Sequence, residues 1–249
     1  MPKQAYMWGI PYEDYEEFQI RKYGFHGTSH KFVSQEAIKY LEAQGKPHSK
    51  IVTCHLGNGS SLAAVLDGKC IDTSMGYTPL GGVMMGTRSG DTDPTVVELL
   101  ANGKQMTTSE VLSYLNKKSG FLGVSGVSSD SRDVLAEADN GNTRCQLARD
   151  MFSYQCKKFI GSYAAALNGL DCIVFTAGIG ENSWEFREMI TDNMDFFGVK
   201  IDKELNKAKS TRGNFTDLTA KDSKVSVLLI PTNEEIVIAR DTKAIVENL

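Results

Sequence analysis

The sequence predicts an α/β fold in which helices flank a mixed sheet. Three strand-like runs, at residues 51–56, 61–66 and 69–73, follow one another with short turns between them and indicate an antiparallel meander. Two further apolar runs, "DCIVFTAG" and "KVSVLLIP", come much later and are typical of buried strands. Because segments with helical periodicity lie between these runs, we expect parallel as well as antiparallel pairing in one layered domain.

The bulk composition is that of an ordinary soluble globular protein. Of the 249 residues, 41% are hydrophobic and 23% are charged, which suffices for one large or two modest domains. The net charge of −4 provides no basic surface, so neither nucleic acid nor a membrane is expected as a partner. The five cysteines lack Cys-x-x-Cys spacing, and free thiols in a reducing cytoplasm fit them better than disulfides.

The first half of the chain contains one long predicted helix and one hairpin. After an irregular or partly helical lead-in, a helix is expected to begin near Ser29 and to end at Gly45 and Pro47. The residues that share its apolar face are Phe32, Val33, Ala37, Tyr40 and Leu41. Asp67 and Gly68 then form the strongest short hairpin signal in the sequence.

The middle of the chain contains two short helices with clear end signals. In "DPTVVELLANG", Asp93 is expected at the N-cap, Pro94 at the first helical position, and Gly103 beyond the end. Thr107 and Glu110 have capping-box spacing and predict the start of a second helix in "VLSYLNKKSG".

Three helices are expected in the second half. A long one is predicted from about Arg144 to Leu167, where Asn168-Gly169 ends it. Another is predicted to begin at Asn182, with Glu185 three residues on. Finally, Thr232 and Glu235 are expected to cap the last helix.

Polar, glycine-containing turns follow three of the predicted strands. They are "HLGNGSS", "FTAGIGENS" and "IPTNEE". Ligands of open α/β sheets bind beyond the carboxyl ends of the strands, and glycine lets phosphate oxygens approach backbone N–H groups closely. The turns therefore predict a phosphate or nucleotide site that is neither a Walker loop nor a dinucleotide fingerprint. A plain loop is the alternative for each turn taken alone.

A fourth polar segment, "GYTPLGGVMMGTRSGDTDP", spans residues 76–94 and contains Arg88. A connection of this length without secondary structure of its own is usually functional or disordered, and its apolar residues argue against disorder. The planar guanidinium of Arg88 suits phosphate or carboxylate oxygens. The alternative is an ion pair from Arg88 to Asp91 or Asp93 that only ties the loop together.

Two further residues are candidates for chemistry. His26 and His30 are four residues apart, which suits zinc, but no glutamate follows His26 as in zinc peptidases. The alternative for His26 is a packed or capping histidine. Glu234 follows a buried strand and suits Mg²⁺, or it is a first-turn carboxylate that the helix dipole favours.

Taken together, the segments resemble a known family. "YGFHGTSH", "HLGNGSS", "GGVMMGTRSGDTDP", "FTAGIGEN" and "IPTNEE", in this order, are similar to the acetate kinase family, and "GFLGVSGVSSDSRD" fits it too. The resemblance covers essentially all 249 residues, and "MGTRSGDTDP" is highly specific. It implies an actin-like (ribonuclease H-like) α/β fold with a mixed central sheet flanked by helices. The implied reaction is reversible, Mg²⁺-dependent phosphoryl transfer from ATP to acetate, giving ADP and acetyl phosphate, in a cytoplasmic homodimer.

The resemblance also implies residue roles. His26 and Arg88 match residues that stabilise the phosphoryl group in transfer, and Glu234 matches a magnesium ligand. The strand turn beside the ATP phosphates corresponds to His55, Leu56, Gly57, Asn58 and Gly59. The adenosine pocket corresponds to Asp130, Ser131, Arg132, Gly178, Ile179, Gly180, Glu181 and Asn182.

The family pattern includes an N-terminal domain that supplies an asparagine magnesium ligand, an acetate-facing arginine and a catalytic aspartate. None has a counterpart here, so the chain is expected to be the C-terminal portion, with residues 1–48 as an interdomain lead-in and helix and residues 49–249 as the nucleotide-binding domain. The chain alone is expected to bind nucleotide but to turn over acetate poorly. Propionate or butyrate kinase activity, or a non-catalytic actin-like nucleotide-binding module, are the alternatives.

Overall fold

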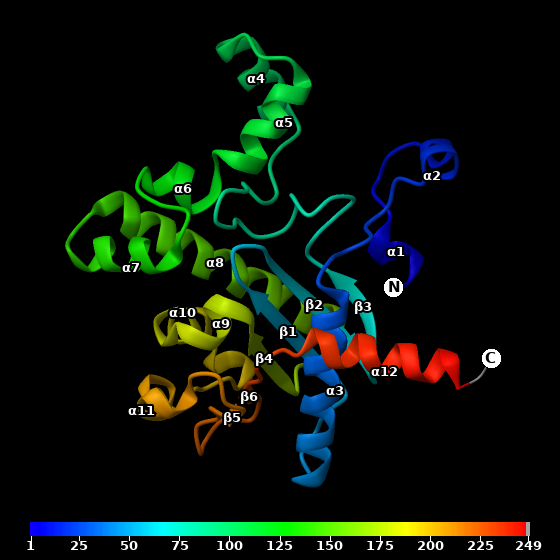
Figure 1. The fold of residues 1–249 in the computed structure, drawn as a ribbon, viewed down its shortest axis with the longest axis vertical. Coiled ribbons are helices and arrows are strands. Elements are labelled where there is room, and N and C mark those ends of the chain that lie inside the picture. Colours follow the sequence, from blue (N-terminus) through cyan, green and yellow to red (C-terminus); the bar gives the residue numbers. More distant parts are fainter. Residues whose placement is uncertain (248–249) are drawn as a thin grey trace.

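In the computed structural model, which describes residues 1–247, six strands form one sheet between layers of helices (Figure 1). The strands are β1 (Lys50–Leu56), β2 (Ser60–Leu66), β3 (Lys69–Thr73), β4 (Cys172–Thr176), β5 (Thr216–Asp217) and β6 (Ser226–Leu229). Their order is β3-β2-β1-β4-β6-β5. Because β1 to β3 pair antiparallel while β1, β4 and β6 pair parallel, the predicted mixed sheet and its meander are confirmed.

Helices cover both faces of the sheet because successive residues of a strand point to opposite sides. Val52 and Cys54 of β1 pack into the larger apolar cluster, whereas Ile51 packs with Val33 and Leu41 into the smaller one. The smaller cluster belongs to α3 (Gly27–Ala43), against which α12 (Glu234–Val246) packs. The elements around the larger cluster are α6 (Gly120–Ser125), α7 (Ser131–Asp139), α8 (Thr143–Ala166) and α10 (Trp184–Thr191).

Three aromatic rings form the centre of the larger cluster. The centroid of the Phe152 ring, on α8, lies 5.0 Å from that of Phe121 on α6 and 5.2 Å from that of Phe186 on α10. All three side chains are fully buried. The cluster therefore joins the three helices to one another and to the sheet.

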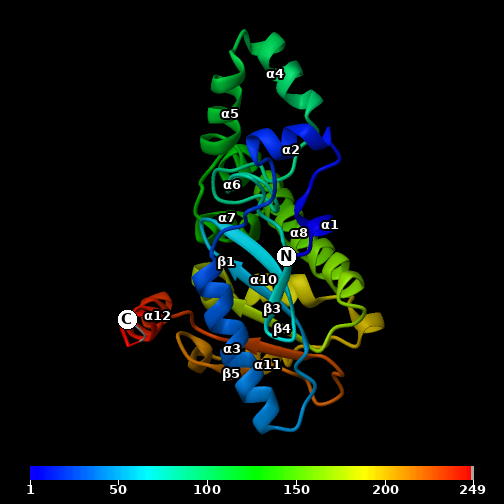
Figure 2. The same cartoon turned by 90° about the vertical axis from the view of Figure 1, so that its right-hand side faces the viewer.

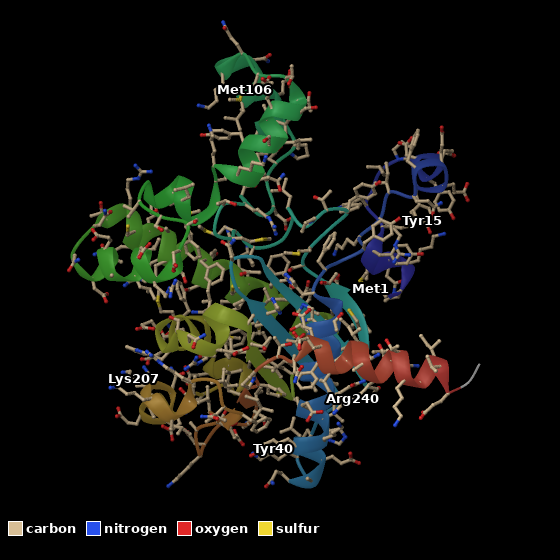
Figure 3. All side chains as sticks on the ribbon, viewed as in Figure 1. Met1, Tyr15, Tyr40, Met106, Lys207 and Arg240 are labelled. Carbon is tan, nitrogen blue, oxygen red and sulfur yellow. The ribbon has the colours of Figure 1, made fainter. Side chains whose placement is uncertain are left out.

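A helical hairpin projects from this body. It consists of α4 (Thr95–Lys104) and α5 (Thr108–Lys117), and both views show it extending away from the sheet (Figures 1 and 2). Met106 lies at its tip (Figure 3). The remaining short elements are α1 (Lys3–Tyr6), α2 (Tyr12–Phe18), α9 (Ala177–Asn182), α11 (Lys203–Lys207) and two 3₁₀ turns, Asp195–Phe197 and Lys209–Thr211.

Several predicted helix ends are confirmed. Thr107 and Glu110 form both hydrogen bonds of the capping box at the start of α5. The long helix α8 begins one residue before the predicted start, and the side chain of Asn142 caps it. Asn168 and Gly169 both take positive φ values directly after it, as the predicted stop requires. None of the helices between residues 1 and 247 combines the length and apolar character needed to span a bilayer.

Two other helix ends differ from the prediction. Helix α4 continues through Gly103, because Gln105 rather than a glycine takes the left-handed conformation with φ of 53°. The last helix is capped by Asn233, whose side chain accepts a hydrogen bond from the N–H of Ile236. Thr232 does not cap it, because the helix begins at Glu234 and Asn233, a favourable cap residue, directly precedes it.

The helix predicted to begin at Asn182 is present as α10, but it begins two residues later than predicted. A short helix, α9, already occupies Ala177–Asn182, and α10 begins at Trp184. Ala177 has φ of 64°, so the chain turns from β4 directly into α9 without an intervening loop. The carboxylate of Glu181 stabilises this turn by accepting the N–H of Ala177 at 2.9 Å.

Truncation of the central ring should cost stability because it leaves a cavity between three helices. We expect Phe152→Ala to lower the free energy of unfolding by about 3–5 kcal/mol in urea titrations. The matched control is Phe196→Ala, because Phe196 is 80% exposed and its loss should change stability by less than about 0.5 kcal/mol. Equal effects of the two variants would contradict the proposed centre of the core.

Candidate active site

Parallel pairing brings the carboxyl ends of three strands to one edge of the sheet. His55 of β1 is in register with Thr176 of β4, and Phe175 of β4 is in register with Leu229 of β6. A cleft of about 840 Å³ lies there. The residues that line it include Gly57, Asn58, Gly86, Ser129, Asp130, Ser131, Arg132, Gly178, Ile179, Asn182 and Ser183. The polar turns "HLGNGSS" and "GIGEN", which follow two of the predicted strands, therefore both line this cleft.

The glycines at the tip of β1 leave no room for side chains. A Cβ atom on Gly86 would lie 2.0 Å from Oδ1 of Asn58, so only glycine allows the two loops to meet. A Cβ atom on Gly59 would lie 3.3 Å from Nη1 of Arg88 and 3.4 Å from Nε2 of His26. Gly59 thus separates the two side chains that the sequence predicts to act on a phosphoryl group.

Arg88 does not form an ion pair with Asp91 or Asp93, which the sequence offered as the alternative to a functional role. Its Nη1 donates to the carbonyl of Pro79 at 3.3 Å. Asp91 instead accepts the N–H of Gly82, and Asp93 accepts the N–H of Thr95. Throughout residues 1–247 no carboxylate lies within ion-pair distance of Arg88, so its positive charge has no acidic partner there.

The loop that carries Arg88 is folded rather than disordered, as the sequence predicts. Met85 is fully buried, and its backbone pairs with the carbonyl of Arg88. The N–H of Gly86 donates to the carbonyl of Asn58, which fixes the loop to the tip of β1. Ser89 and Leu115 form a further backbone hydrogen bond, which connects the loop to the base of α5.

His26 precedes α3 in the left-handed conformation, with φ of 60°, and its side chain does not cap the helix. Its Nδ1 lies 2.8 Å from Oγ of Ser61. Its ring stacks on the ring of His55 with centroids 3.9 Å apart and an interplanar angle of 16°. Partial burial, reinforced by the charge of Arg88, lowers the pKa of His26, so the imidazole is neutral near pH 7.

His30 and His55 lie behind His26 and are buried. His30 is hydrogen-bonded on both sides, through Nδ1 to Thr53 and through Nε2 to Ser61. Burial lowers the pKa of His30 and that of His55 from 6.5 to about 3. Since both ring nitrogens of His30 are engaged, the structure offers no support for a zinc site made by His26 and His30.

The predicted adenosine residues fall into two groups. Asp130 caps α7 by accepting the N–H of Arg132, and Ser131 and Arg132 line the cleft beside it. Gly178, Ile179 and Asn182 of α9 line the cleft as well. The two groups therefore line one common cleft.

The remaining predicted residues support the cleft without lining it. Leu56 is fully buried in the core, and His55 donates to or accepts from Oγ of Ser29 at 2.8 Å. Gly180 faces the backbone of β1 and β4. The carboxylate of Glu181 accepts the N–H groups of Ala177 and Thr232, which joins the tips of β4 and β6.

The sequence analysis does not identify Arg187, whose side chain is hydrogen-bonded to the backbone of α9 beside the cleft. The side chain is 1% exposed, and Nη1 donates to the carbonyls of Gly180 at 2.8 Å and Glu181 at 3.1 Å. Its Nε donates to Oδ1 of Asn206 at 2.7 Å. Burial lowers the pKa of Arg187 to about 10, so the group stays charged at neutral pH. Its burial could have been inferred from its spacing, because Arg187 lies three residues before the apolar Ile190 and so shares a face of α10 with it.

Glu234 lies exposed in the first turn of α12. Nowhere in the described 247 residues do three or more His, Cys, Asp or Glu side chains gather into a group able to hold a metal. One carboxylate is nevertheless compatible with Mg²⁺, which retains several waters and binds one or two carboxylates together with substrate phosphates.

The buried histidines should make stability depend on pH. The unfolded chain protonates His30 below its ordinary pKa of 6.5, whereas the folded chain does so only near 3. The contribution of His30 to the free energy of unfolding is therefore fully present above about pH 6.5. It decreases as the pH falls towards 3, and the loss is about 2 kcal/mol at pH 5. Urea unfolding at pH 7 and pH 5 measures this loss.

The loss between pH 7 and pH 5 should shrink by about 2 kcal/mol in His30→Gln, which removes the titrating group. His48→Gln is the control, because Nδ1 of His48 contacts only the carbonyl of Lys46. A His30→Gln chain that loses as much stability as the wild type would refute this assignment.

Comparison with known protein families gives a consistent result. The profile of the Acetokinase family matches residues 1–240. The acetate kinase of Desulfitobacterium hafniense is 55% identical in an alignment that covers 99% of this chain and 61% of that protein. The acetate kinase of Thermoanaerobacterium thermosaccharolyticum is 56% identical in an alignment that covers 100% of this chain and 62% of that protein.

Solved structures agree. Porphyromonas gingivalis acetate kinase matches with a TM-score of 0.92 and 44% identity, over 99% of this chain and 61% of that one. A propionate kinase from Francisella tularensis matches with a TM-score of 0.88 and 42% identity, over 97% of this chain and 60% of that one. The predicted actin-like α/β fold is thereby confirmed. The chain spans about three-fifths of the length of the curated relatives it matches, and it belongs to the acetokinase family.

Proposed function

We propose that this chain provides the nucleotide and phosphoryl-binding part of an acetate kinase, which transfers a phosphoryl group reversibly from ATP to acetate. The observation that carries the proposal is the position of His26 and Arg88. Nε2 of His26 and Nη1 of Arg88 flank Gly59, next to two residues that line the nucleotide-sized cleft. The relatives named acetate kinase support the choice of reaction.

Phosphoryl transfer depends mainly on positioning and on compensation of negative charge. Arg88 supplies a permanent positive charge that no carboxylate neutralises within the described chain. His26 supplies a neutral ring nitrogen that approaches the same face of Gly59 as Nη1 of Arg88. We assign the phosphates to the space beside Gly57–Gly59 and the adenosine to the two walls formed by Asp130–Arg132 and by α9.

Glu234 is the proposed protein ligand for Mg²⁺. Bound Mg²⁺ supplies positive charge to the phosphate oxygens of ATP. The exposed position of Glu234 leaves room for waters and phosphates as further ligands.

The rest of the acetate kinase assignment is also a proposal. We place acetate binding and the catalytic aspartate outside this chain, whose relatives are longer. We further propose a cytoplasmic homodimer, and a nucleotide-binding domain at residues 49–249 onto which α3 of residues 1–48 packs.

A second acyl substrate is possible within the same family. The similar structure from Francisella tularensis is named a propionate kinase, and butyrate would require the same chemistry with a larger acyl pocket. A non-catalytic nucleotide-binding module is the alternative from another class, and it predicts nucleotide binding without any effect of Arg88 on turnover.

Nucleotide binding can be tested on the chain itself. A Cβ atom on Gly178 meets nothing within 4 Å although the residue lines the cleft, so Gly178→Leu fills the cleft without straining the fold. We expect wild-type chain to bind ADP in calorimetry and Gly178→Leu to bind at least about tenfold more weakly, a loss of about 1.4 kcal/mol. Gly103→Leu, which is equally unhindered on α4, is the matched control. Equal affinities in all three proteins would place the nucleotide elsewhere.

The role of Arg88 requires a protein of the family's full length, made by joining this chain to the missing part of the Desulfitobacterium hafniense relative. There we expect Arg88→Leu to lower kcat by about 100-fold or more, with nucleotide affinity within a few-fold. Lysine should restore activity only partly, because it lacks the planar fork. Arg240→Leu, on the exposed surface of α12, is the control (Figure 3). Near-normal kcat in Arg88→Leu would exclude Arg88 from the chemistry.

A further inference from the structure

A chain of hydrogen bonds runs through the protein to His26. Oγ1 of Thr53 on β1 lies 2.7 Å from Nδ1 of His30. Nε2 of His30 lies 2.8 Å from Oγ of Ser61 on β2. Oγ of Ser61 lies 2.8 Å from Nδ1 of His26. Two side chains of the sheet and one of α3 thus connect the buried interior to the half-buried ring at the site.

The number of hydrogens limits this chain to two arrangements. Each hydroxyl has one hydrogen, and each imidazole has one because burial lowers the pKa of His26 and His30 and keeps both neutral. Each of the three links needs one hydrogen. A third arrangement, in which Oγ of Ser61 accepts from both histidines, would leave the hydroxyl hydrogen of Ser61 without an acceptor, because among the described residues this oxygen contacts only the two rings. The donors therefore point the same way along the chain, either from Thr53 towards His26 or in reverse.

The environment of Thr53 distinguishes the two directions. In the reverse direction its hydroxyl hydrogen needs another acceptor, and the one available is the carbonyl of Ala63 at 3.5 Å. That distance is well beyond the usual range for O–H···O bonds, whereas the 2.7 Å to His30 lies within the normal range. The hydroxyl of Thr53 consequently donates to His30, Nε2 of His30 donates to Ser61, and Ser61 donates to Nδ1 of His26.

We infer that Thr53, His30 and Ser61 form a relay that fixes His26 as a neutral imidazole with its hydrogen on Nε2. This nitrogen faces the space beside Gly59 that Nη1 of Arg88 also faces. Two N–H donors then converge on one place and do not pair with each other, which suits the oxygens of an anion. Thr53, His30 and Ser61 are positioning residues, and their relevance to catalysis rests on the proposed function of His26.

The stacked ring of His55 keeps His26 in the orientation that the relay needs. Nδ1 of His55 is bonded to Ser29 at 2.8 Å, which fixes the plane of its ring. His26 lies parallel to it within 16°. The stacking on His55 and the hydrogen bond to Ser61 together limit rotation of the His26 ring.

The tautomer can be measured directly on the chain with ¹⁵N-labelled histidine. Long-range ¹H–¹⁵N correlations at neutral pH distinguish a hydrogen on Nε2 from one on Nδ1. We expect both His26 and His30 to carry it on Nε2. A hydrogen on Nδ1 of His26 would overturn the inference without any need for a variant.

Thr53→Val removes the hydroxyl at the start of the relay while keeping the shape of the side chain. We expect His26 to lose its single tautomer in this variant and to keep it in Thr53→Ser. Thr73→Val is the matched control, because Thr73 is a buried threonine of the same sheet whose hydroxyl donates to the carbonyl of Leu62 instead of to a histidine. An unchanged tautomer in folded Thr53→Val would refute the relay, and Ser61→Ala provides the same test if Thr53→Val does not fold.

Kinetics in the joined, full-length protein separate the relay from the proposed function. We expect Thr53→Val to lower kcat by about tenfold, less than the loss of a whole donor, with the KM for nucleotide within a few-fold and with rescue in Thr53→Ser. A changed tautomer with unchanged kcat would refute the role of His26 but not the relay. A lower kcat with an unchanged tautomer would refute the relay.

Discussion

The parallel pairing of β1 with β4 is the constraint on which the site depends. It aligns His55 with Thr176, so the polar turns after both strands leave the sheet at the same edge. The antiparallel pairing of β1 with β2 then returns the chain past the same edge and places Ser61 opposite His55. One central strand therefore determines both where the cleft lies and which side chains lie behind His26.

The absence of a side chain at two glycines also determines the shape of this edge of the sheet. Gly86 allows the Arg88 loop to touch Asn58, and Gly59 leaves a gap between two side chains that point to the same place. The charge in this region is one-sided, because Arg88 has no acidic partner within the described part of the chain while the neighbouring imidazoles are neutral. An anion there would lie next to the positive charge of Arg88, which is ion-paired with no carboxylate of the described residues.

Much of the fold followed from local sequence patterns, but the contacts behind the site did not. The strand-like runs and the Asp67-Gly68 turn predict the meander, since both signals depend only on residues that are neighbours in the sequence. The glycines of "GIGEN" predict a turn, whereas the structure has a short helix there, whose carbonyls at Gly180 and Glu181 accept hydrogen bonds from Arg187. The histidine relay joins residues up to 35 positions apart on three elements, so only the assembled fold reveals it.

The projecting pair of α4 and α5 has a mechanical consequence for Arg88. The loop of residues 76–94 leads directly into this pair, and its backbone is bonded to the base of α5 through Ser89 and Leu115. Thr87 makes a second connection there, by donating its hydroxyl hydrogen to the carbonyl of Asn116. The base of α5 and the backbone on both sides of Arg88 are thus held together, so a displacement of this part of the hairpin would also displace the backbone that carries the guanidinium.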